Sequence, residues 1–118
     1  MFEAEDIRDW RGHDVVDAEG HKIGSLEAIY VDTTTDLPAF ATVVTGLPTK
    51  RRLNFVPLDG ATVKPGALKV RYDKKRVKDA PSIDTDGELV AEEEPKLFAY
   101  YDLSYQLGPS GARRLGRR

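Results

Sequence analysis

The chain has 118 residues, no cysteine and a net charge of −2 at pH 7. This length indicates one domain with one core, and the lack of cysteine excludes disulfides, thiolate nucleophiles and thiolate metal sites. The acidic N-terminus, MFEAED, is followed by no apolar run, and no stretch approaches the ~20 apolar residues that span a bilayer. We therefore expect a soluble, cytoplasmic protein with no integral membrane segment.

The charges are unevenly distributed along the chain. Residues 1–36 carry ten acidic and three basic residues, and residues 50–78 carry ten basic and two acidic ones. Residues 79–105 carry eight acidic residues and one basic residue, and residues 106–118 carry four arginines and no acid. Either these blocks meet in the fold and neutralise one another, or the basic residues form a face for an acidic partner.

The first elements are a predicted hairpin with two glycines. Val15-Val16 is a short apolar run, and Gly20 follows in a turn where it can adopt a positive φ. Residues 22–32 predict a long strand, but the apolar spacing breaks period two between residues 23 and 26, at Gly24. An isolated glycine in a strand indicates a bulge or a sharp bend. We expect Gly20 to close the hairpin and Gly24 to let the second strand bend, as it must in a small barrel.

The remaining pattern predicts more strands, then a helix. Strands are expected over residues 39–45, 52–58, 61–64 and 67–72, with Pro57 at an edge or a strand end because it cannot donate to a ladder. Residues 74–79 predict one helical turn, residues 83–88 an acidic loop, and residues 90–103 a helix whose first turn contains three glutamates and Pro95. Residues 106–118 contain three glycines, a proline and four arginines, which predicts a disordered tail.

These elements predict a mainly β fold, a small and strongly bent β-barrel of about six strands with a short C-terminal helix. We expect residues 1–80 to form the barrel with an N-terminal lead-in. Residues 81–105 are expected to form an acidic loop and a helix that packs on the barrel. Residues 106–118 would then be a basic disordered tail.

Three segments carry a family resemblance: GHDVVDAEGHKIGSLEAIYVDTTT, PAFATVVTG and RLNFVPLDGATV. Together they resemble the PRC-barrel family, whose pattern is matched here by Val15, Asp17, Gly20, Ile23, Gly24, Asp32, Val56 and Pro57. The resemblance implies a β-barrel module without a known catalytic centre. It also implies kinship with the cytoplasmic domain of the reaction-centre H subunit and the C-terminal domain of a ribosome maturation factor. Their shared theme is protein–protein contact, although a fold by itself names no partner.

Catalytic and metal chemistry find little support in the sequence. The two histidines, His13 and His21, lie near Asp14, Asp17 and Glu19, a set that suits zinc or nickel, but both flank turns in a polar stretch. The segment DTDGELVAEEEP fails the EF-hand template because its sixth position is a leucine. No nucleophile–base pair and no phosphate-binding loop is evident. We expect no cofactor, no metal and no enzymatic activity.

The sequence therefore predicts a non-catalytic protein–protein interaction or adaptor module that self-associates, as a homodimer, and binds an unidentified protein partner. Open strand edges would provide the self-contact. The alternative is electrostatic binding of RNA, DNA or an anionic membrane surface through residues 50–78 and the arginine tail. Trp10 is expected to cap the barrel or to act as an exposed anchor. The candidate interaction surface comprises Trp10, Lys50, Arg51, Arg52, Lys69, Arg71, Lys74, Lys75 and Arg76.

Overall fold

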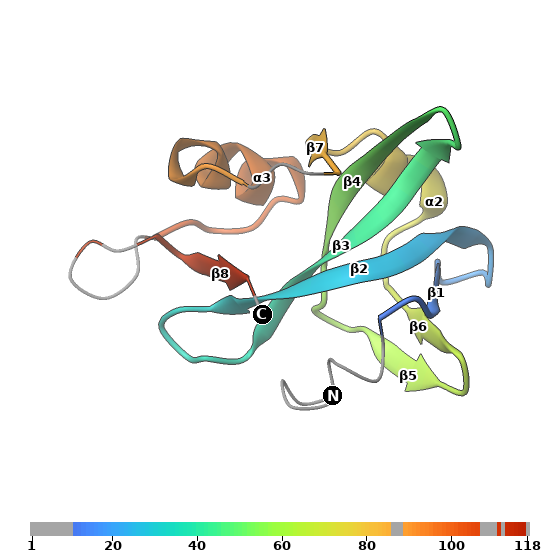
Figure 1. Cartoon of the computed structure of the whole chain (residues 1–118). Coiled ribbons are helices and arrows are strands. Elements are labelled where there is room, and N and C mark those ends of the chain that lie inside the picture. Colours follow the sequence, from blue (N-terminus) through green and yellow to red (C-terminus); the bar gives the residue numbers. More distant parts are fainter. Residues whose placement is uncertain (1–10, 86–88, 107–110, 112, 118) are drawn as a thin grey trace.

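One bent, mainly antiparallel sheet, in which only β1 and β6 of the described strands pair in parallel, dominates the computed structural model of the chain (Figure 1). The structure describes residues 11–85, 89–106, 111 and 113–117. In the described residues its strands are β1 (Asp14–Val16), β2 (Lys22–Asp32), β3 (Pro38–Leu47), β4 (Lys50–Pro57), β5 (Thr62–Lys64), β6 (Ala67–Lys69), β7 (Ser82–Asp84) and β8 (Leu115–Arg117). The spatial order is β5-β6-β1-β2-β3-β4-β7, and β8 pairs with β2 beside this path. The ends of the path do not pair with each other, so the sheet curls without closing. The mainly β barrel-like class predicted from the sequence is confirmed, with eight strands in place of about six.

The bend in β2 originates at the β1–β2 ladder. Val15 pairs with Gly24 and Val16 pairs with Lys22, so Ile23 is an extra residue and forms a bulge. The predicted bulge is confirmed. Gly24 is required because it has no Cβ atom, and not because its backbone is left-handed. A Cβ atom on Gly24 would lie 2.0 Å from the carbonyl oxygen of Val44 on β3. Gly24 therefore permits a close approach of two backbones. Gly20 does adopt a left-handed conformation, with φ of 87°, in the β1–β2 turn.

Two short helices cover the sheet. Helix α2 (Lys74–Lys78) begins after Asp73, whose side chain accepts a hydrogen bond from the backbone N–H of Arg76. Helix α3 (Glu94–Tyr100) follows a 3-10 turn, η2 (Ala91–Glu93), and has Pro95 in its first turn as predicted. Because α3 ends at residue 100, the helix is shorter than the predicted span of 90–103. None of the helices in the described ranges is long and apolar enough to cross a membrane.

The core is formed by residues of the sheet together with residues of α2 and α3. Its largest buried side chains include Phe40, Phe55, Ile29 and Leu97. The Tyr101 hydroxyl, just after α3, donates a hydrogen bond of 2.6 Å to the carbonyl oxygen of Phe55. Such a contact satisfies both a buried hydroxyl and a backbone acceptor that no neighbouring strand covers. The helix is therefore fixed to the sheet by apolar packing together with a polar contact.

The acidic loop predicted over residues 83–88 is partly wrong. Ser82–Asp84 form β7, which pairs antiparallel with Arg52–Asn54 of β4. The side chain of Arg52 fixes this pairing because it donates to Ser82 Oγ and to Asp84 Oδ1, each at 2.8 Å. An edge strand with a charged residue in the right register can recruit a polar segment that has no apolar pattern of its own.

The disorder predicted for residues 106–118 is wrong for the segment that forms β8, Leu115–Arg117. This segment pairs antiparallel with Tyr30–Asp32, and the side chain of Leu115 is fully buried. Its flanking arginines meet acids of the N-terminal block, because Arg114 contacts Asp32 at 2.7 Å and Arg117 pairs with Glu27. Residues 107–110, 112 and 118 of this predicted tail lie outside the described residues. So do Trp10 and residues 86–88, which belong to the segment tested against the EF-hand template.

Candidate functional site

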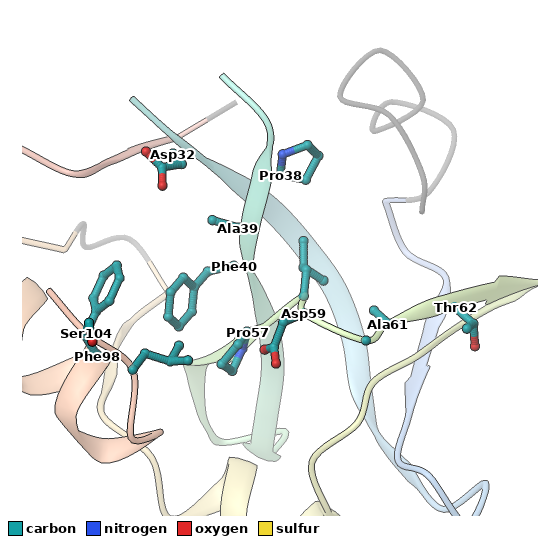
Figure 2. Close-up of a pocket in the computed structure, with 13 residues that line it drawn as sticks. Asp32, Pro38, Ala39, Phe40, Pro57, Asp59, Ala61, Thr62, Phe98 and Ser104 are labelled. Carbon is teal, nitrogen blue, oxygen red and sulfur yellow. The ribbon is translucent and has the colours of Figure 1, made fainter. Parts of the chain in front are cut away.

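An apolar groove of about 620 Å³ opens at the end of the sheet where β3 begins and β4 ends (Figure 2). Its apolar lining comprises Pro38, Ala39, Phe40, Pro57, Leu58, Ala61, Phe98 and Leu103. Its polar lining comprises Asp32, Asp59, Thr62 and Ser104. A volume between 300 and 1,000 Å³ with mostly apolar walls and a few polar groups is typical of binding sites. We refer to this feature as the groove.

Several local rules of the sequence shape the groove. Pro57 ends β4 because it has no N–H to donate, and the next N–H, that of Leu58, donates to the carbonyl oxygen of Ala39 at 2.8 Å. The chain then turns at Gly60, whose φ is 74°, and leads into β5. On the opposite wall the ring of Phe98 packs against Phe40 with centroids 5.3 Å apart. The groove therefore lies between β3, the β4–β5 turn and α3.

Both ionisable residues that line the groove are acids, and each is held by a base. Burial alone would raise the pKa of the Asp32 carboxyl, but hydrogen bonds from Arg114 and Thr34 outweigh it and hold that pKa below its ordinary value. Asp59 accepts a hydrogen bond from the Tyr72 hydroxyl at 3.0 Å and contacts Arg71 at 3.3 Å. Burial and then the bond to Asp59 raise the pKa of Tyr72. The lining contains neither histidine nor lysine, and both of its carboxylates are paired with arginines.

An exposed leucine precedes the groove lining in sequence. Leu37, the residue before Pro38, is 49% exposed and is one of three large hydrophobic side chains that the described part of the chain leaves in solvent. The others are Val63 and Val90. Contiguous apolar surface around a concave site is a common mark of protein contact. The groove is thus suited to an apolar group of a partner rather than to an anion.

The predicted basic surface divides into two groups in the structure. Arg52, Arg71 and Arg76 are paired with Asp84, Asp59 and Asp102 at 2.8, 3.3 and 3.3 Å. Arg76 also lies over the ring of Tyr72, 5.3 Å from its centroid. Together with the pairs of the C-terminal segment, these contacts confirm that acidic and basic blocks neutralise each other in the fold. Lys69 is half-buried on β6 and does not join the exposed set.

The remaining bases gather near one end of the molecule. Lys50, Arg51, Lys74 and Lys75 are exposed, and among the described residues none has a carboxylate within 4.0 Å. The first two begin β4 and the other two begin α2. The end of α2 is fixed beside β4 because the side-chain amide of Asn54 donates to the carbonyl oxygen of Ala80 at 3.0 Å. We call these four residues the basic end, which Figure 1 places away from α3.

A cluster of possible metal ligands forms at the β1–β2 turn. Asp17, Glu19 and His21 present ligand atoms within 4.8 Å of one another. However, Asp17 is 1% exposed, and its two oxygens accept backbone N–H bonds from Glu19, His21 and Lys74. The carboxylate thus joins the hairpin to the start of α2, a structural role that explains the acid without a metal.

This role of Asp17 predicts an acid-sensitive fold. Burial would raise the pKa of Asp17, but its three backbone hydrogen bonds outweigh it and lower the pKa below the ordinary value. A lowered pKa in the folded state means that the carboxylates of Asp17 and Asp32 stabilise the fold above about pH 4, and that this stabilisation is lost as the pH falls further. Urea unfolding at a series of pH values should show the free energy of unfolding falling below about pH 4. In Asp17→Asn the free energy of unfolding should fall less steeply with decreasing pH than in the wild type. An equal fall in both proteins would contradict this role of Asp17.

A family comparison agrees with this architecture. The model of the PRC-barrel domain matches residues 2–78, which is more than half of the chain. The matched part includes the β1–β2 hairpin and the groove-lining residues between positions 32 and 62. The chain belongs to the PRC-barrel family. A search of curated proteins finds no match to this PRC barrel.

The groove of this PRC barrel was not predicted from the sequence. Its lining comes from five separate segments, and only Asp32, as a family match, and Pro57, as a family match and a strand end, were singled out from the sequence. The turn residues Gly20 and Gly24 lie in the β1–β2 hairpin, outside the lining. One signal was present in the sequence: Leu58 is apolar although it lies between the Pro57 strand end and the Asp59-Gly60 turn.

Proposed function

We propose that this PRC barrel is a non-catalytic, cytoplasmic protein–protein interaction module, and that the groove is its contact surface. The observation that carries the proposal is the open apolar lining of the groove; Leu37, the residue before the lining residue Pro38, is also exposed. Concave, largely preformed apolar surfaces with few polar groups accept an anchoring side chain of a partner without large rearrangement. Apolar residues make up most of the lining, which favours an apolar anchor.

A matched pair of exposed residues provides the test. Leu37 at the groove is 49% exposed, and Val90 on another surface is 52% exposed. The full chain is used as bait in an extract of its native cells, and the captured proteins are quantified by mass spectrometry. We expect Leu37→Glu to reduce capture of the specific partners by roughly tenfold, and Val90→Glu to leave it unchanged. Equal capture by wild type and Leu37→Glu would contradict the groove as the contact surface.

The second candidate function is binding of a polyanion through the basic end. It is supported by the four exposed bases without nearby acids, and it would be weak and steeply dependent on salt. It is disfavoured by the C-terminal arginines, because Arg113, Arg114 and Arg117 are engaged with Glu94, Asp32 and Glu27. Affinity for RNA, duplex DNA and anionic vesicles at low and physiological salt separates the two functions. Absence of binding at low salt would remove this candidate.

A further inference from the structure

The hairpin formed by β3 and β4 has a composition that complements the groove. Its two-residue turn, Pro48-Thr49, is exposed and joins Leu47 to Lys50, which are paired in the ladder. The exposed bases Lys50 and Arg51 follow directly. The hairpin therefore presents a proline at its tip and two positive charges directly beside the tip, and Figure 1 shows it extending away from α3.

Two exposed acids lie at the groove end of the molecule. Asp59 in the lining is 42% exposed, and Asp102, next to the lining residue Leu103, is 88% exposed. Each carboxylate contacts one arginine of its own chain, yet both face solvent, where a second base can approach. Apolar walls with acids at the rim match a proline tip with bases beside it.

The hairpin cannot enter the groove of its own chain. In the β3–β4 ladder Phe40 pairs with Pro57 at the groove, and Leu47 pairs with Lys50 at the hairpin turn. Seven residues of strand separate these two ends, a distance of about 23 Å at 3.3 Å per residue. A rigid ladder fixes this distance, so only the hairpin of another molecule can reach the groove.

We propose that the occupant of the groove is the β3–β4 hairpin of a second copy of this chain, so that copies associate head to tail. This inference rests on the proposed function, because it uses the same groove. The contact is heterologous, since the hairpin of one copy meets the groove of the next, and such contacts form a ring or an open chain of subunits. The strands at the two ends of the path, β5 and β7, have only three residues each and offer a much smaller surface for self-pairing. A small interface of this kind gives a dissociation constant of roughly 10 to 1,000 μM.

Two full-length variants test this geometry. Lys50→Glu with Arg51→Glu blocks the hairpin and leaves the groove intact. Ala61→Arg places a long cation in the groove lining and leaves the hairpin intact. We expect each variant alone to be monomeric in sedimentation velocity, and their mixture to form a dimer and nothing larger, because one functional hairpin meets one functional groove.

Matched controls separate this contact from general electrostatics. Lys74→Glu with Lys75→Glu changes the charge equally on α2, and Ala99→Arg places an arginine on the exposed face of α3. Both control variants should associate like the wild type. Monomeric wild type at the highest soluble concentration would overturn head-to-tail association. So would a mixture of the two blocked variants that stays monomeric.

Disulfide trapping gives a second, independent measurement because the chain has no cysteine. A Pro48→Cys chain is mixed with an Ala61→Cys chain under mild oxidation, and Ala99→Cys replaces Ala61→Cys in the control mixture. We expect at least roughly tenfold more mixed disulfide with Ala61→Cys than with Ala99→Cys. Equal yields would overturn the inference. In either test the capture experiment with Leu37→Glu still decides the proposed function, since it reports on proteins other than this chain.

Discussion

Gly24→Val is expected to lower the free energy of unfolding by more than about 3 kcal/mol. The added Cβ atom would lie 2.0 Å from the carbonyl oxygen of Val44 and 2.8 Å from Cγ1 of Val43, both on β3. Neither atom can move far, because Val43 is buried and Val44 belongs to the central β2–β3 ladder. The two strands would have to separate at the bulge that bends the sheet.

A second glycine in the sheet provides the control. A Cβ atom on Gly116 of β8 would meet only side-chain carbons, the nearest at 3.7 Å, which is ordinary van der Waals distance. Gly116→Val should therefore change the free energy of unfolding by less than about 1 kcal/mol. Urea unfolding of both variants measures the difference. Similar costs at the two positions would show that close approach of β2 and β3 does not explain Gly24.

The second large effect is expected at Glu94, a fully buried carboxylate at the start of α3. It accepts hydrogen bonds from the Tyr105 hydroxyl, from Arg113 Nε, and from the backbone N–H groups of Arg114 and Leu115, at 2.8 to 3.1 Å. All four donors belong to the segment after α3. Glu94 thereby fixes β8 against the edge of β2.

Glu94→Ala is expected to lower the free energy of unfolding by about 2 to 4 kcal/mol, because it leaves buried donors without an acceptor. Glu94→Gln should also destabilise, since both carboxylate oxygens accept bonds and an amide nitrogen would face a donor. Hydrogen exchange at Leu115 should accelerate in both variants. Glu92→Ala, an exposed change on the preceding turn, should stay within about 0.5 kcal/mol of wild type. An equally stable Glu94→Ala would show that this carboxylate does not hold β8.

The strands could be predicted where local patterns determine them. The predicted span of residues 22–32 is that of β2, and the break in its alternation marked the bulge at Gly24. Both features follow from the period-two pattern and its break, which depend on near neighbours in sequence. The close approach of Val44 that requires glycine at position 24 depends on the fold and could not be predicted in this way.

The C-terminal segment could not be predicted in this way. Its composition of glycine and arginine is typical of disorder, and only the fold brings Arg114 to Asp32, which lies 82 residues earlier. Glu94 was expected to serve the helix dipole, whereas its carboxylate binds the chain end. The surplus of acids in residues 1–36 was the available signal, because so many carboxylates on a small barrel require partners.

The candidate site was the least predictable feature. The groove is defined by where β4 ends, where α3 packs and how the β4–β5 turn runs, and no short segment contains that information. The basic residues were found, but sequence alone could not separate Arg76, held over Tyr72, from the exposed Lys75. Only the contacts in the folded structure separate the held side chain of Arg76 from the exposed side chain of Lys75.

The central claim is that the groove and the β3–β4 hairpin are the two halves of a protein contact. Amide chemical shifts of the isotope-labelled full chain, recorded as its concentration rises, test this claim most directly. We predict that residues 48–51 of the hairpin and residues 59–62 and 103–104 of the groove shift together, with one common dissociation constant. Shifts confined to any other surface, or shifts of the hairpin without the groove, would contradict it.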